Sequence, residues 1–143
     1  MAKVEKAIII SAPVEKVFGY IDDPTNQPEI WPSLVEMKDV QRLPNGGTSA
    51  RWVYKMAGMR FQGTSEDTER VANQRIVTKT KGGVESTQTW IFQPEAGGTR
   101  VSFKVEYTVP IPLLGKLAEA VIVKMNEREV ELLLANLKVR MEA

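Results

Sequence analysis

The segment from Pro112 to Met141 constrains the fold more than any other part of the chain. After Pro112 it contains no proline, and its one glycine, Gly115, lies in the first turn. Good helix formers (leucine, alanine, glutamate, lysine and methionine) fill most of the remaining positions. At about 1.5 Å per residue, a helix of this length measures about 40–45 Å and exceeds most globular helices. A chain of 143 residues must therefore lay it across the rest of the domain.

One side of this helix is predicted to face the rest of the domain. At 100° per residue, apolar side chains recur on that side, with one asparagine among them. The residues are Leu114, Leu117, Ala118, Val121, Met125, Leu132, Asn136 and Val139.

A second apolar stripe runs along nearly the opposite side of the helix. Its members approximate the a/d spacing of a coiled coil, and a helix that packs on a sheet needs only one apolar side. The stripe indicates a weak homodimer or a contact with a partner protein there. The alternative is a monomer with scattered apolar surface residues. The stripe consists of Val123, Val130, Leu134 and Met141.

Composition excludes several kinds of chemistry. The chain has no cysteine and no histidine, so thiolate nucleophiles, Ser-His triads and Cys- or His-ligated metals are excluded, and we expect no metal and no cofactor. A net charge of +1 gives no indication of nucleic-acid binding. We also find no signal segment and no membrane-spanning run, so we expect a cytoplasmic protein without membrane insertion.

The chain before the long helix reads as short strands joined by turns. A first strand is predicted at 4–11, a short helix at 13–21 and an irregular or one-turn segment at 26–32. Glycine and proline turns then separate six further strands. This uniform hairpin spacing predicts one antiparallel meander in a single domain, 1–143. The six strands are predicted at 34–43, 49–56, 60–71, 74–80, 84–93 and 99–109.

Alternation within the strands gathers most aromatic residues on one face, which we expect to point at the long helix. Polar residues lie among them, and a mostly apolar lining with a few polar groups is typical of a ligand cavity. Each tryptophan either stacks on a ligand or packs in the core, and we favour packing. The predicted ligand-binding residues are Trp52, Tyr54, Met56, Phe61, Ser65, Gln88, Trp90, Phe103, Tyr107, Val121 and Met125.

Three carboxylates need separate interpretation. Glu129 lies near the apolar side of the helix and is the candidate catalytic acid or base. The alternative, which we favour, is that Arg128 and Glu129 contact neighbouring groups or solvent at the cavity rim. Asp67 and Glu69 share the alternation of the inward residues, but we expect both to lie past the edge of the sheet.

Several motifs resemble a known superfamily over essentially the whole chain. They are Ile10-Ser11-Ala12-Pro13 with Val14 and Val17, Asp23-Pro24, Trp31-Pro32, Gly98-Thr99-Arg100-Val101, the approach from Tyr107 to Leu117, and Leu134-Ala135-Asn136-Leu137-Lys138. The chain resembles the START-like, Bet v 1-like (SRPBCC) superfamily, in particular its polyketide cyclase/dehydrase and lipid-transport branch. The resemblance implies an α+β helix-grip fold, in which a curved antiparallel meander sheet wraps around the C-terminal helix and two short helices follow the first strand.

The resemblance and the mixed lining together favour one function. We expect the protein to bind a hydrophobic small molecule, such as a lipid, isoprenoid or polyketide-like compound, in the cavity between sheet and helix. One alternative is a cyclase or dehydratase that uses a cavity carboxylate or tyrosine. A second is a chaperone- or ribosome-associated module, because relatives of this fold also serve in that way.

Overall fold

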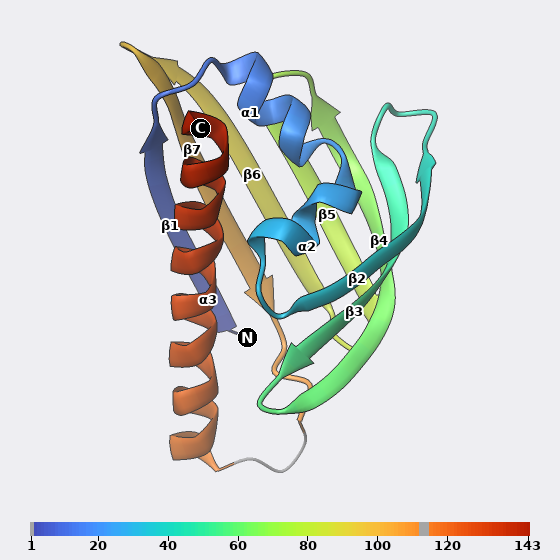
Figure 1. The fold of residues 1–143 in the computed structure, drawn as a ribbon. Coiled ribbons are helices and arrows are strands. Elements are labelled where there is room, and N and C mark those ends of the chain that lie inside the picture. Colours follow the sequence, from blue (N-terminus) through green and yellow to red (C-terminus); the bar gives the residue numbers. More distant parts are fainter. Residues whose placement is uncertain (1, 112–114) are drawn as a thin grey trace.

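The computed structural model describes residues 2–111 and 115–143. The predicted helix start at Pro112 and the helix residue Leu114 lie outside the described residues. One antiparallel sheet of seven strands, in the order β1-β7-β6-β5-β4-β3-β2, curves around the helices (Figure 1). The elements are β1 (Ala2–Ile10), α1 (Val14–Ile21), the 3₁₀ turn η1 (Pro24–Asn26), α2 (Gln27–Ile30), β2 (Leu34–Arg42), β3 (Thr48–Met56), β4 (Met59–Val71), β5 (Arg75–Gly82), β6 (Ser86–Glu95), β7 (Gly98–Tyr107) and α3 (Lys116–Glu142).

This order confirms the predicted helix-grip fold. The first and last strands pair along their whole length, from Ala2 opposite Tyr107 to Ile10 opposite Thr99. Every other pair joins strands that are consecutive in the chain. Several hairpin turns use a left-handed backbone, among them those at Gly46 (φ 88°) and Gly97 (φ 78°), a conformation that glycine adopts without steric cost.

Helices α1 and α2 cover one end of the sheet (Figure 1). The ring of Phe18 on α1 meets the ring of Phe92 on β6 edge-on, with 5.2 Å between centroids. Arg70 on β4 pairs with Asp22 at the end of α1 through two hydrogen bonds of 2.9 Å, and its guanidinium lies 5.1 Å from the Phe18 ring. Stacking and bidentate pairing therefore fix α1 against the sheet.

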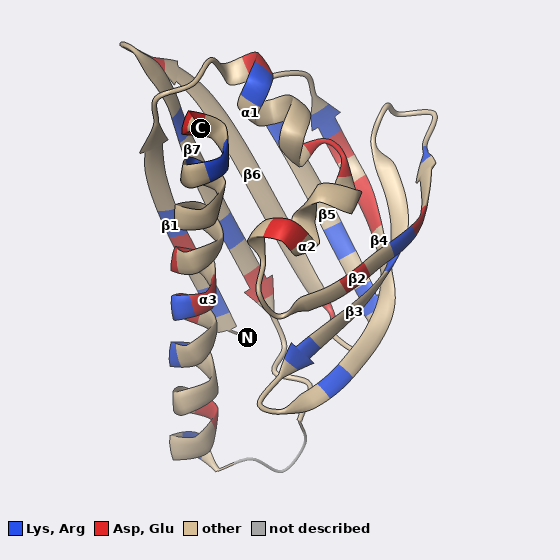
Figure 2. Cartoon of the chain, in the orientation of Figure 1, with Lys and Arg blue, Asp and Glu red and all other residues tan. Residues whose placement is uncertain are grey.

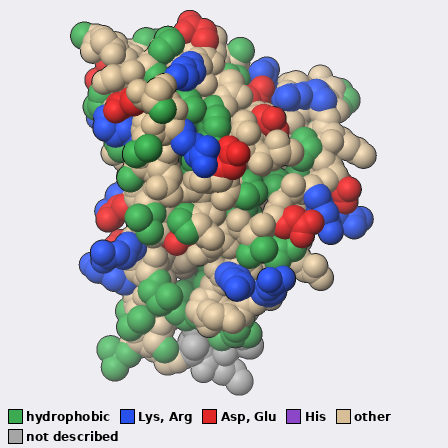
Figure 3. All heavy atoms as spheres, viewed as in Figure 1, with side chains coloured by type: hydrophobic (Ala, Val, Ile, Leu, Met, Phe, Trp, Pro, Cys, Tyr) green, Lys and Arg blue, Asp and Glu red, His purple; other side chains and the backbone are tan. Residues whose placement is uncertain are grey.

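Helix α3 packs on the sheet with a different side from the predicted one. Val121 and Met125 are 60% and 53% exposed, and Leu117, Leu132 and Val139 are exposed as well. Figure 3 shows exposed hydrophobic side chains near the start of this helix. The predicted side relied on the first half of the helix, whereas most of the buried residues lie in its second half. The buried residues are Ile122, Val130, Leu133, Leu134, Leu137 and Met141.

The prediction that this second stripe forms a homodimer contact is also wrong. Val130, Leu134 and Met141 are buried in the core, and Val123 is partly buried. A surface already covered by the sheet cannot bind a second copy. The same apolar spacing suits a coiled-coil seam and a helix-on-sheet contact, so the stripe by itself could not identify its partner.

Charged residues form no single-sign surface on this view. Figure 2 shows lysine, arginine, aspartate and glutamate interspersed along α3 and across the strands, in keeping with the net charge of +1. None of the helices in the described ranges combines the length and the apolar character that a membrane span requires.

Candidate functional site

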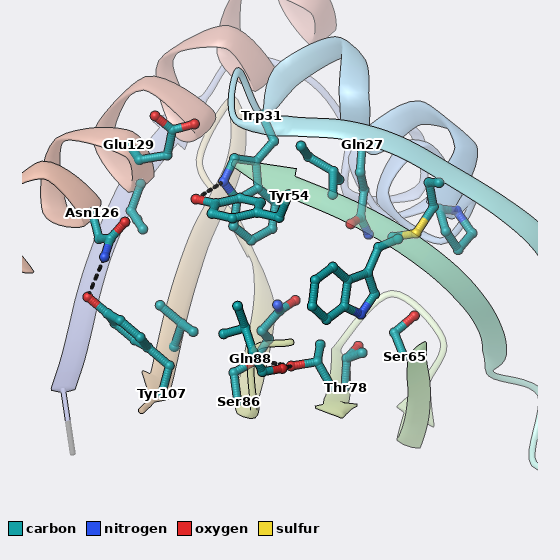
Figure 4. Close-up of a pocket in the computed structure, with 18 of the residues that line it drawn as sticks. Gln27, Trp31, Tyr54, Ser65, Thr78, Ser86, Gln88, Tyr107, Asn126 and Glu129 are labelled. Carbon is teal, nitrogen blue, oxygen red and sulfur yellow. Dashed lines mark hydrogen bonds between the residues drawn. The ribbon is translucent and has the colours of Figure 1, made fainter. Parts of the chain in front are cut away.

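A half-open pocket of about 90 Å³ lies between the inner face of the sheet, α2 and α3. Its apolar wall comes mainly from strands and from the segment around α2. Its polar groups come from α2, from β3 to β7 and from α3 (Figure 4). The apolar residues include Trp31, Leu34, Met37, Trp52, Met56, Val84, Val105 and Val130, and the polar ones include Gln27, Thr48, Tyr54, Ser65, Asp67, Thr78, Thr80, Ser86, Gln88, Tyr107, Asn126 and Glu129.

The structure brings only part of the predicted set together. Six predicted residues line the pocket: Trp52, Tyr54, Met56, Ser65, Gln88 and Tyr107. Phe61 is partly buried and packs against the core instead. Val121 and Met125 lie on the exposed side of α3, because the opposite side of that helix contacts the sheet.

Trp90 and Phe103 also lie away from the pocket. They face each other across β6 and β7 with ring centroids 4.4 Å apart, and both are fully buried. Trp31, which follows α2, packs edge-on against Phe103 at 5.6 Å. Strand alternation predicts the inward direction of these rings, but it cannot predict that Trp31 covers Phe103.

Trp31 and Tyr54 form a hydrogen-bonded pair in the pocket wall (Figure 4). The indole Nε1–H of Trp31 donates to the Tyr54 hydroxyl at 3.3 Å, and the two rings meet edge-on at 5.8 Å. Burial raises the pKa of Tyr54 above its usual value, and the nearby charge of Glu129 adds to this. Tyr54 therefore keeps its proton at neutral pH, and the bond from Trp31 uses only its oxygen as acceptor.

Tyr107 and Asn126 connect β7 to α3 beside the same pocket (Figure 4). The Nδ2 group of Asn126 donates to the Tyr107 hydroxyl at 2.7 Å. Burial raises the pKa of Tyr107, and the bond from Asn126 opposes part of that rise. This pair holds the helix at a fixed distance from the last strand.

Glu129 lies in the pocket wall contributed by α3 (Figure 4). Its Oε1 accepts a hydrogen bond of 2.6 Å from the backbone N–H of Ser33, just before β2. Such a charge-assisted bond is a structural contact of the kind we favoured for this residue. Arg128 is exposed.

The expectation that Asp67 lies past the sheet edge is wrong. Asp67 is buried and accepts hydrogen bonds from the Thr48 N–H (2.8 Å), the Thr48 hydroxyl (3.1 Å) and the Thr78 hydroxyl (2.7 Å). The β2–β3 turn folds over it so closely that a Cβ on Gly47 would lie 2.5 Å from the Asp67 Cβ. The β4–β5 register shifts directly after Asp67, and Glu69 beyond the shift is exposed.

Trp52 on β3 contributes an unpaired donor to the pocket wall. Its partner across the strands is Gly63, where an added Cβ would lie 2.6 Å from the indole Cζ2. The missing side chain of Gly63 therefore gives the indole its space. Within the part of the chain that the structure describes, the buried Nε1–H of Trp52 has no hydrogen-bond partner.

Sequence reasoning missed several pocket residues for a common reason. The sequence predicts that Trp31 packs in the core or stacks on a ligand, and it does not predict that Asn126 or Asp67 reaches the cavity. All three depend on how α2, α3 or a turn is placed over the sheet. Of the residues described, no group of three or more acidic side chains is arranged to hold a metal ion.

Solved structures with the same fold cover nearly the whole chain. A protein from Thermus thermophilus is 28% identical and aligns with a TM-score of 0.77 over 97% of this chain and 96% of that one. A START superfamily protein from Mycobacterium smegmatis aligns with a TM-score of 0.82 at 18% identity, over 99% and 98% of the two chains. The Zhui aromatase/cyclase from a Streptomyces species aligns with a TM-score of 0.76 at 15% identity, over 99% and 96%.

The two lower identities show likeness of fold alone. No curated protein sequence matches the chain. A family model described as polyketide cyclase / dehydrase and lipid transport matches residues 1–142. The chain belongs to this polyketide cyclase / dehydrase and lipid transport family.

Proposed function

We propose that the protein binds a hydrophobic small molecule, such as a lipid, isoprenoid or polyketide-like compound, without covalent chemistry. The observation that carries the proposal is the half-open pocket between the sheet and α3, which combines tryptophan, methionine and valine side chains with polar side chains from the sheet, α2 and α3. Removing about 100–200 Å² of apolar ligand surface from water contributes roughly 2.5–5 kcal/mol at about 25 cal/mol per Å². The polar groups then set the orientation.

An apolar, environment-sensitive dye tests this proposal. We expect the dye to bind the full chain with one saturable site. Gln88 lines the pocket from β6, so Gln88→Trp fills space and should abolish dye binding. Its neighbour Thr87 belongs to the other face of the strand, and Thr87→Trp should leave dye binding intact. Equal dye affinity in both variants would show that the pocket is not the binding site.

A cyclase or dehydratase activity is the second candidate. The observation in its favour is that the Glu129 carboxylate and the Tyr54 hydroxyl lie in the same pocket wall (Figure 4), where one could accept and the other donate a proton. The Zhui aromatase/cyclase shares this fold. Turnover of a poly-β-ketone model compound that is lost in Glu129→Gln, with dye affinity retained, would support catalysis. Unchanged turnover would exclude Glu129 as the acid or base.

A further inference from the structure

The charges that line the pocket are all of one sign. Asp67 lies at the β4–β5 side and Glu129 at the α3 side, both in the pocket wall. Across residues 2–111 and 115–143, no lysine or arginine lines this pocket. A bound carboxylate or phosphate would therefore meet two acidic groups and no compensating cation. Transfer of an anion from water into such a site is strongly unfavourable.

The same wall presents two hydrogen-bond donors, the Tyr54 hydroxyl and the Trp52 indole. The Tyr54 hydroxyl accepts from Trp31, whose indole can only donate, so the proton of Tyr54 points to another acceptor, either the neighbouring Ser33 side chain or a ligand. The buried Nε1–H of Trp52 has no partner among the described residues. An unpaired buried donor costs free energy until an acceptor reaches it.

We propose that, given the binding function above, this pocket selects neutral apolar molecules that carry a carbonyl oxygen and rejects carboxylates and phosphates. The carbonyl oxygen accepts from the Tyr54 hydroxyl or from the Trp52 indole, and the apolar body contacts the aromatic and aliphatic wall. A carbonyl supplies an acceptor for the Trp52 indole, adds an alternative acceptor for the Tyr54 hydroxyl, and adds no negative charge beside Asp67 and Glu129. The proposal thus narrows the ligand to neutral ketones, quinones, esters and related lipids.

The pocket volume sets the size of a useful probe. An enclosed apolar cavity of about 150 Å³ holds one benzene molecule. The present pocket measures about 90 Å³, less than that cavity, and is half-open, so a probe should be no larger than one ring with a short substituent, and part of it would lie outside the opening. Ethylbenzene, acetophenone and benzoate have nearly the same shape and differ in polarity and charge.

The test is a titration of the full ¹⁵N-labelled chain with these three compounds at neutral pH, followed by chemical-shift changes. We expect saturable changes at pocket residues with ethylbenzene and acetophenone, and binding of benzoate at least about tenfold weaker than that of acetophenone. Acetophenone should move the Trp52 indole proton signal downfield, because that proton gains an acceptor, whereas ethylbenzene should not. Trp52→Phe assigns the signal, and the indole of Trp90 in the core is the internal control.

Three variants separate the donors from the charges. Tyr54→Phe should weaken acetophenone about three- to tenfold, the effect of losing one neutral hydrogen bond, and leave ethylbenzene within about twofold. Glu129→Gln and Asp67→Asn should each strengthen the binding of benzoate relative to that of acetophenone, because each removes one negative charge. If a variant fails to fold, the shift of the Trp52 indole proton in the unaltered chain, compared between acetophenone and ethylbenzene, still tests the proposal.

The outcomes distinguish the two proposals. If benzoate binds the unaltered chain as tightly as acetophenone, or if Tyr54→Phe weakens ethylbenzene and acetophenone alike, selection for a neutral carbonyl is wrong while apolar binding stands. If ethylbenzene itself gives no saturable shift at pocket residues, the pocket does not bind apolar molecules, and the proposed function fails with it.

Discussion

Glu129 in α3 accepts a 2.6 Å hydrogen bond from the backbone N–H of Ser33, and this bond joins the long helix to the start of β2. Residues 96 positions apart in the chain are thereby fixed beside each other at the edge of the pocket. The bond gives the one acidic residue of α3 that lines the pocket a structural role.

The first prediction concerns this bond. Glu129→Ala should lower the free energy of unfolding by about 1–3 kcal/mol, because a partly buried N–H loses its charged acceptor. Glu129→Gln retains an acceptor oxygen and should cost less. Urea denaturation measures both, with Glu131→Ala at an exposed position of the same helix as the control. Equal losses for Glu129→Ala and Glu131→Ala would mean that the bond adds nothing to stability.

The buried carboxylate of Asp67 should be more sensitive still. Asp67→Ala leaves the Thr48 N–H and the Thr78 hydroxyl without their acceptor, so we expect a loss of about 2–4 kcal/mol in urea denaturation. Glu69, two residues further on, is exposed and pairs with Arg75 at 3.2 Å. Glu69→Ala should change stability by less than about 0.5 kcal/mol. A small effect at both positions would argue against the buried network.

The orientation of α3 leads to a third prediction. Leu134 is buried against the sheet, whereas Leu132 is 44% exposed. Leu134→Ala should destabilise the protein by about 2–5 kcal/mol, and Leu132→Ala should remain within about 0.5 kcal/mol. Thermal or urea unfolding decides between the two sides of the helix. The reverse order of effects would restore the side predicted from sequence.

The fourth prediction concerns alkaline pH. Burial raises the pKa of Tyr54 and Tyr107, and burial together with the bond to Glu29 raises that of Tyr20 to about 12. Tyrosines of the unfolded chain titrate near about 10, so the folded state holds these protons more tightly. Their contribution to stability is complete below about pH 10 and is lost as the pH rises through the raised values.

Urea unfolding from about pH 8 to 11 measures this loss, and tyrosinate absorbance follows the titration itself. Lysines titrate in the same range, so the comparison with Tyr54→Phe isolates one tyrosine. The variant should lose stability less steeply with pH than the unaltered chain. Identical slopes would indicate that Tyr54 does not titrate differently on folding.

Much of the architecture follows from local sequence signals. Turn residues at regular spacing predicted the hairpins, and the structure has strands close to the predicted bounds, such as β3 at Thr48–Met56 for the predicted 49–56. Alternation placed Trp52, Tyr54 and Met56 on one face, and all three line the pocket. These features are local, because a turn depends on a few residues and alternation on one strand.

The side of α3 that is buried was decided by tertiary structure. Both sides of α3 carry apolar stripes. From the sequence, the side with more apolar residues was predicted to be the buried one. In the folded protein the side of Val130, Leu134 and Met141 rests on the sheet, and the side of Val121 and Met125 remains exposed. The free energy gained by burying apolar side chains is proportional to the area removed from water. The side of α3 that fits against the sheet is therefore buried, even though the other side carries more apolar residues.

The candidate site shows the same division. Local alternation is enough to predict which strand residues point inward, because each side chain alternates with its neighbours along the strand. The packing of Trp31 on Phe103, the enclosure of Asp67 by the turn at Gly47, and the contribution of Asn126 and Glu129 to the wall follow from the folded structure. These contacts join residues far apart in the chain, and their positions depend on the packing of whole elements, which no local pattern encodes.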